Sequence, residues 1–84
     1  MSQNKEDLKN KIIYRASYRG SKEMDILMSG FVKSVVDELD IGQLEQLNKL
    51  VSLEDENLTS IKNRKLNIDF VDTLILKKFQ KFKL

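Results

Sequence analysis

Apolar residues recur at every third or fourth position along most of this 84-residue chain, and no proline interrupts them. This spacing places apolar side chains on one face of an α-helix, whereas a half-buried strand needs alternation, which no stretch of the sequence sustains. An apolar content of 40% and a charged content of 33% suit a packed helical domain and not a disordered chain. The pattern therefore predicts an all-α fold, a compact bundle of about five short helices. We expect a single domain spanning residues 1–84, with frayed ends at 1–6 and 82–84.

Capping residues divide the apolar pattern into five helical segments. Gly20 is expected to end the first helix in a left-handed conformation, and Ser21 to cap the second. Asp40 opens a sequence that resembles a capping box, which marks the start of the third helix. Ser52 and Asn67 are expected to cap the fourth and fifth helices. The apolar faces expected to turn inward are Leu8, Ile12, Ile13 and Ala16; Met24, Leu27, Met28, Phe31, Val35 and Leu39; Leu44, Leu47, Leu50 and Val51; Leu58 and Ile61; and Val71, Leu74, Ile75 and Phe79.

Side chains that carry most enzyme chemistry are absent from the sequence. Because it has no Cys and no His, the chain has no thiol, no disulfide and no imidazole for proton transfer or metal binding near neutral pH. Glu23 and Asp25 are two residues apart, so on a helix they point in different directions. The acidic run at 54–56 lacks the ligand spacing and the turn glycine of a calcium loop, and no glycine-rich phosphate loop occurs. We therefore expect no enzyme activity and no metal site.

Positive charge is concentrated at the C-terminal end of the chain. The net charge is +2, and Lys77, Lys78, Lys81 and Lys83 alternate there with two phenylalanines. The helix dipole favours lysine near the end of a helix, so a solvated helix end is one interpretation. The alternative is a small basic nucleic-acid-binding or regulatory protein that acts through this C-terminal Lys/Phe helix.

The amino-terminal sequence and the hydropathy pattern bear on location. No apolar run approaches the roughly 20 residues that span a bilayer. The opening MSQNKEDLKNK contains acidic residues and lacks the apolar core of a secretion signal. We expect a cytoplasmic bacterial protein that does not insert into a membrane.

The stretch YRGSKEMD, residues 18–25, places a glycine between opposite charges where the first two helices should meet. One interpretation is a plain helix–helix corner surrounded by solvated charges. The other is a docking edge. Arg19 and Glu23 are four residues apart across the corner, so both are expected to project from the same exposed edge. Gly20 has no side chain, which lets the backbone of a partner approach closely.

The longer run IIYRASYRGSKEMDILMSGF, residues 12–31, resembles the succinate dehydrogenase flavinylation factors. These small bacterial and mitochondrial proteins assist covalent attachment of FAD to the flavoprotein subunit. Their signature is Arg-Gly-x-x-Glu, which reads here as Arg19-Gly20-x-x-Glu23, with an upstream aromatic residue and serine. Residues 50–61 resemble the family more loosely, because Asn57 stands where a second Asp is usual and Ile61 where a Trp is usual.

The resemblance implies a helper of assembly and not an enzyme. It implies binding to the flavoprotein subunit of succinate dehydrogenase, with that of fumarate reductase as a second client, and promotion of covalent FAD attachment. FAD then belongs to the partner, and this chain binds no cofactor stably and no nucleic acid. We expect the Arg-Gly corner to insert near the flavin site of the partner and to hold its domains by preorganisation. The partner-binding residues expected on this basis are Tyr14, Arg15, Tyr18, Arg19, Gly20, Glu23, Asp25 and Asp55.

Overall fold

The helices follow the order of the apolar stripes in the sequence. The computed structural model describes residues 4–83, and within them it contains α1 (Lys5–Ser17), α2 (Lys22–Val35), a short 3₁₀ turn (Val36–Glu38), α3 (Ile41–Val51), α4 (Asp55–Lys62) and α5 (Thr73–Lys81), with no strand. The predicted all-α bundle of five helices is confirmed. Residues 1–3 and 84, expected among the frayed ends, lie outside the described residues, and α1 begins at Lys5 behind its cap Asn4.

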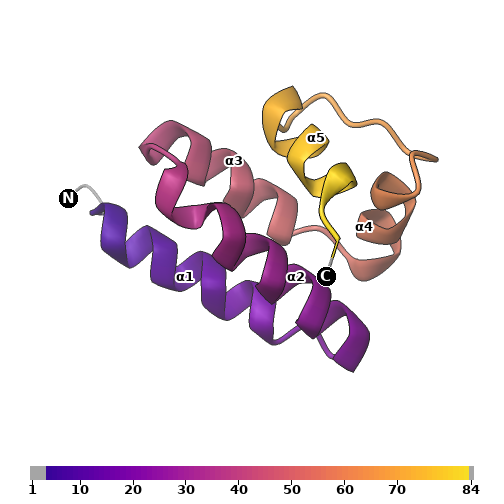
Figure 1. Ribbon diagram of the computed structural model, residues 1–84, viewed down its shortest axis with the longest axis horizontal. Coiled ribbons are helices and arrows are strands. Elements are labelled where there is room, and N and C mark those ends of the chain that lie inside the picture. Colours follow the sequence, from indigo (N-terminus) through magenta and orange to yellow (C-terminus); the bar gives the residue numbers. More distant parts are fainter. Residues whose placement is uncertain (1–3, 84) are drawn as a thin grey trace.

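The helices are arranged so that the α1–α2 corner lies close to the connection between α3 and α4. Helices α1 and α2 lie side by side and antiparallel (Figure 1). Helix α3 packs against α1 and leads into α4 and α5, which pack against each other. Within residues 4–83, no helix has the length and apolar character needed to cross a membrane.

The core is built from the predicted apolar faces of all five helices. Phe31 of α2 links the two ends of the chain, because its ring centroid lies 5.2 Å from that of Phe79 in α5 and 5.6 Å from that of Phe82. The prediction that Leu74 turns into the core is wrong, since this residue is 46% exposed. The buried apolar side chains are Leu8, Ile12, Ala16, Met28, Phe31, Val32, Val35, Val36, Leu39, Leu44, Leu47, Leu50, Val51, Leu58, Ile61, Val71, Ile75 and Phe79.

Two of the predicted caps, Ser21 and Asp40, are confirmed, and so is the left-handed conformation of Gly20, although α1 already ends at Ser17 with Tyr18 as its cap. Gly20 has a φ of +94°, in the region that only glycine adopts readily. The Ser21 hydroxyl accepts a hydrogen bond from the backbone N–H of Met24 at the start of α2. Asp40 and Gln43 form the full capping box, each side chain accepting from the backbone N–H of the other at 2.8 and 3.0 Å.

The predicted starts of the last two helices are wrong. Ser52 lies at the end of α3, where its hydroxyl donates to the carbonyl of Asn48 at 2.7 Å, so α4 begins behind Glu54. Helix α5 begins behind Asp72 and not behind Asn67, because the carboxylate of Asp72 accepts from the backbone N–H of Leu74. The late start leaves residues 63–72 as a connection between α4 and α5.

The second helix is also shorter than its apolar stripe. It ends at Val35, and the 3₁₀ turn then carries the chain to Leu39, which has an extended backbone and is still buried. The apolar stripe therefore predicted burial correctly but extended the helix too far.

Candidate functional site

The corner between α1 and α2 is built by Gly20 and by a hydrogen bond from its neighbour. The carboxylate of Asp25, in the first turn of α2, accepts the backbone N–H of Arg19. A Cβ added to Gly20 would meet no atom within 4 Å, so the backbone faces open space at this point. The corner is therefore both a well-determined turn and an accessible stretch of bare backbone.

The side chain of Arg19 points inward, contrary to the prediction that it projects with Glu23 from the exposed edge. Only 9% of this side chain is exposed. Its Nε lies 2.6 Å from Oδ1 of Asp55, the first residue of α4, and its two terminal nitrogens donate to the backbone carbonyls of Val51 and Leu53. The last carbonyls of a helix have no partner within it, and the planar fork of a guanidinium can satisfy several acceptors at once. Long-range acceptors thus turn the side chain away from solvent.

We refer to Arg19, Asp25 and Asp55 as the Arg19 tie. Its hydrogen bonds join the α1–α2 corner to the end of α3 and the start of α4. Hydrogen bonds to charged groups stabilise a fold more than neutral ones do, by roughly 1.5–3 kcal/mol each. Three predicted partner-binding residues therefore have structural partners within the protein, and they hold the corner against α3 and α4.

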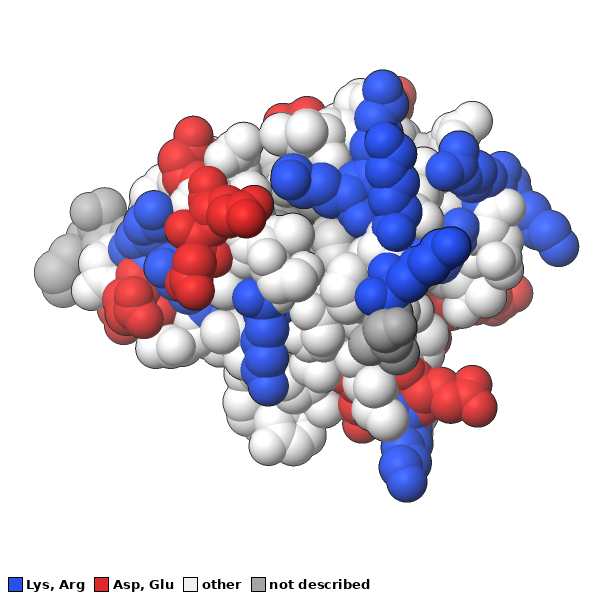
Figure 2. All heavy atoms as spheres, in the orientation of Figure 1, with Lys and Arg blue, Asp and Glu red and all other residues white. Residues whose placement is uncertain are grey.

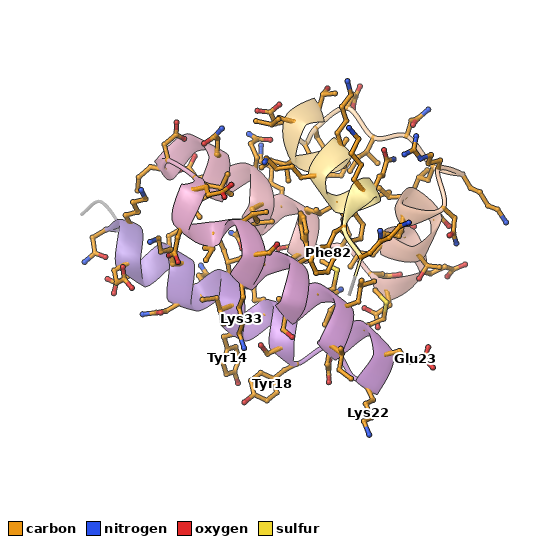
Figure 3. The ribbon with its side chains drawn as sticks, in the orientation of Figure 1. Tyr14, Tyr18, Lys22, Glu23, Lys33 and Phe82 are labelled. Carbon is orange, nitrogen blue, oxygen red and sulfur yellow. The ribbon has the colours of Figure 1, made fainter. Side chains whose placement is uncertain are left out.

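The other five predicted residues lie on the outside of the corner, and we call them the corner face: Tyr14, Arg15, Tyr18, Gly20 and Glu23. The side chains of Tyr14 and Tyr18 are 66% and 72% exposed, with ring centroids 4.7 Å apart. Figure 3 shows the two tyrosines pointing outward side by side from the end of α1, whereas Glu23 points outward from the start of α2, on the other side of Lys22. The corner face thus offers two aromatic rings, a cation, a carboxylate and an open backbone.

Arg15 is held in place beside the tyrosines. Its Nη1 donates to Oδ1 of Asn48 at 3.2 Å and to the hydroxyl of Ser52 at 2.9 Å, so α3 supports the cation. A shallow hollow of about 350 Å³ lies here. Its lining residues are Tyr14, Arg15, Tyr18, Arg19, Val51 and Ser52. Ser52 was expected to cap a helix. Its hydrogen bond to Arg15 was not predicted, because that bond depends on the packing of α1 against α3.

Sequence reasoning also missed an apolar side chain near the corner face. Ile26 is 49% exposed and lies one turn after Glu23, on the same side of α2. The signal was present in the sequence, since Ile26 falls outside the apolar stripe that the second helix buries.

The two positions that depart from the family pattern behave differently. Ile61 is fully buried in the core, so it replaces the usual aromatic side chain as a packing residue. Asn57 is exposed on α4, one turn or less from Asp55. Neither residue contributes to the corner face.

The aromatic side chains at the C-terminal end of the described chain, Phe79 and Phe82, pack toward the core. Phe79 is buried, and Phe82 packs edge-on against Phe31. Proteins that bind single-stranded nucleic acid combine positive charge with exposed aromatic rings on which bases stack. The Lys/Phe pattern thus has Phe79 in the core and Phe82 partly buried against it, and its lysines lie on the surface or partly buried.

These features define a small all-helical protein with an exposed aromatic and charged corner. Across residues 4–83, no group of three or more His, Cys, Asp or Glu side chains is placed to hold a metal ion.

A family model described as the flavinator of succinate dehydrogenase (Sdh5) matches residues 10–83, and the chain belongs to this family. The resemblance drawn from residues 12–31 is thereby confirmed. A protein named FAD assembly factor SdhE, from Acetobacter pasteurianus, is 31% identical over 51 residues, which cover 61% of this chain and 47% of that protein. The chain spans about half the length of the curated relative it matches. No solved structure matches the chain.

Proposed function

We propose that this protein is an assembly factor that binds the flavoprotein subunit of succinate dehydrogenase and promotes covalent attachment of FAD to it. The observation that carries the proposal is the family match over residues 10–83, which includes the whole corner and the Arg19 tie. The FAD belongs to the partner, and the protein contributes contacts and no catalytic group.

The corner face is the proposed docking surface. Tyrosine and arginine, together with tryptophan, are enriched among the residues that dominate binding energy at interfaces. Tyrosine contributes a large rigid contact area, and arginine contributes a planar group with several hydrogen-bond donors. Tyr14, Tyr18 and Arg15 supply these groups, and the open backbone at Gly20 allows close approach by a partner. The corner face consists of five residues, and a small contact surface suits a transient complex.

The proposed mechanism is positioning of the partner. Holding two reacting groups in a favourable geometry accelerates their reaction without any chemistry by the residues that hold them. Such positioning needs a rigid surface. The Arg19 tie supports this role because it fixes the corner against α3 and α4 through hydrogen bonds that span more than 30 residues of sequence.

The test of this function is covalent flavin formation on the purified flavoprotein subunit. The apo-subunit is incubated with FAD, with and without this protein, then denatured and separated on a gel, and the flavin fluorescence of the band is measured. We expect the initial rate of covalent incorporation to rise at least about tenfold, as expected for a positioning effect. Serum albumin at equal concentration is the control. A rate equal to that control would contradict the proposed function.

The flavoprotein subunit of fumarate reductase is the proposed second client. The same assay with this subunit as the acceptor measures it directly. Faster incorporation on both subunits supports a shared docking surface, and acceleration restricted to succinate dehydrogenase would limit the function to that client.

A further inference from the structure

A second surface, away from the corner, carries seven of the fifteen Lys and Arg side chains. Figure 2 shows Lys and Arg side chains gathered over α5 and the end of α4, whereas Asp and Glu side chains gather over the connection between α2 and α3. The two contributing segments, 62–65 and 77–83, are separated in sequence by the connection that precedes α5. The fold therefore combines two basic runs on one side of the molecule. The cations involved are Lys62, Arg64, Lys65, Lys77, Lys78, Lys81 and Lys83.

Lys62 shows that the two segments lie against each other. Its ammonium group donates to the backbone carbonyls of Gln80 at 3.1 Å and Phe82 at 2.5 Å, at the end of α5. Burial lowers the pKa of Lys62, and the nearby charges of Lys83 and Arg64 lower it further. Lys62 is thus a structural cation, and the charges around it are close enough to repel it.

Five of the remaining cations have no carboxylate partner among the described residues. The ion pairs within residues 4–83 involve Lys9, Arg19 and Lys78. We refer to the five exposed residues outside these pairs as the basic face: Arg64, Lys65, Lys77, Lys81 and Lys83. Helix dipoles favour the lysines in the last turns of α4 and α5. Arg64, Lys65 and Lys77 lie outside those turns, and like charges gathered on one surface repel one another.

The backbone conformation of Arg64 is a second observation that points to a role for this surface. It has a φ of +61°, in the left-handed region, at the end of α4. The backbone N–H groups of Arg64 and Lys65 donate to the carbonyls of Ile61 at 3.0 Å and Ser60 at 2.8 Å, the pattern that usually places glycine at this point. An arginine here is more strained than a glycine, and a strained residue with no structural partner indicates a role on the surface.

We propose that the basic face binds an acidic surface of the same flavoprotein subunit and accelerates its association with the corner face. The inference rests on the proposed function. Helix α4 links the two surfaces, since it begins at Asp55 of the Arg19 tie and ends at Lys62. Its eight residues span about 12 Å, and a typical interface covers about 800 Å² on each partner, which is wide enough for both surfaces.

An acidic protein surface fits this face better than nucleic acid does. Of the phenylalanines interleaved with the lysines, Phe79 is buried and Phe82 is partly buried with its ring edge against Phe31, which leaves little ring surface for bases to stack on. Complementary charge between proteins acts mainly on the association rate, and its effect falls as salt screens the charges.

The experiment measures association and dissociation rates with the purified flavoprotein subunit at 50 and 300 mM NaCl. The test variant combines Arg64→Gly, Lys77→Gln and Lys81→Gln. At 50 mM NaCl we expect its association to be about tenfold slower than that of the wild type, with little salt dependence and little change in dissociation rate. Arg64→Gly alone is compared with Lys5→Gln, which removes one exposed charge from the far end of α1. Only Arg64→Gly should slow association, and its melting temperature should not fall.

Each outcome decides the inference. Equal association rates for wild type and the triple variant would overturn the basic face as a docking surface and leave the proposed function standing. No binding of the wild type to the subunit would overturn both. A 20-nucleotide single-stranded oligonucleotide is titrated in parallel. Tight oligonucleotide binding that the triple variant loses, with unchanged association to the subunit, would assign the face to nucleic acid and contradict the inference.

Discussion

Tyr18 and Arg19 are neighbours in the sequence, yet they belong to regions with opposite properties. Tyr18 is 72% exposed and its ring lies beside the exposed ring of Tyr14, whereas the arginine side chain is 9% exposed and bonds to three groups across the fold. The corner face therefore depends on the Arg19 tie for its position and contributes little to stability itself. In the Arg-Gly-x-x-Glu signature, the arginine therefore has a structural role, whereas the glycine and the glutamate lie at the surface.

The largest expected effect is that of Arg19→Ala on stability. Removing the guanidinium leaves Asp55 and two carbonyls without their donor, which costs about 2–3 kcal/mol. For a chain of this size we expect the melting temperature, followed by circular dichroism, to fall by about 10–20 °C. Arg19→Lys is the matched control, since it keeps the positive charge but loses the planar guanidinium with its several donors. We expect this variant to recover little of the lost stability. A melting temperature within about 2 °C of that of the wild type would show that the Arg19 tie does not stabilise the fold.

Tyr18→Ala should show the reverse behaviour. The ring is exposed, so we expect the free energy of unfolding to change by less than about 0.5 kcal/mol. Binding to the flavoprotein subunit should weaken about 30-fold, as measured by titration calorimetry, because an aromatic anchor at an interface contributes about 2 kcal/mol. Lost stability with unchanged binding would place Tyr18 with the Arg19 tie and remove the distinction between the two regions.

Asp55→Asn sharpens the comparison inside the Arg19 tie. The amide oxygen can still accept from Nε of Arg19, but the attraction between opposite charges is lost. We expect a decrease of about 1 kcal/mol in the free energy of unfolding from urea titration, smaller than for Arg19→Ala. An equal loss for both variants would mean that the bonds to the carbonyls of α3 contribute nothing.

Glu23→Gln is expected to have the smallest effect on stability. Glu23 lies in the first turn of α2, where the helix dipole favours a negative charge by about 0.3–1 kcal/mol. Urea unfolding should show a loss within that range, together with weaker binding to the flavoprotein subunit. Unchanged binding would remove Glu23 from the corner face.

Local features of the site could be predicted from the sequence. The left-handed glycine, the serine cap of α2 and the capping box of α3 each depend on residues within a few positions of one another. The apolar stripes likewise predicted most of the core, because burial follows helical periodicity wherever a helix forms.

The direction of the Arg19 side chain could not be predicted in this way. Its acceptors lie 32–36 residues further along the chain, and they come together only after α3 and α4 have packed. The starts of α4 and α5 failed for a related reason. Several polar residues in each connection can act as a cap, and tertiary contacts decide among them, as they do for Ser52 beside Arg15.

The most direct test of the account compares Gly20→Arg with Gly20→Ala in the covalent flavin assay, at a temperature where both variants are folded. Both carry the backbone penalty of a side chain at a φ of +94°, but only arginine adds bulk to the open space in front of the corner. The account predicts that Gly20→Ala accelerates covalent flavin incorporation nearly as well as the wild type, whereas Gly20→Arg does so about tenfold less. Equal acceleration by the two variants would contradict the corner face as the docking surface.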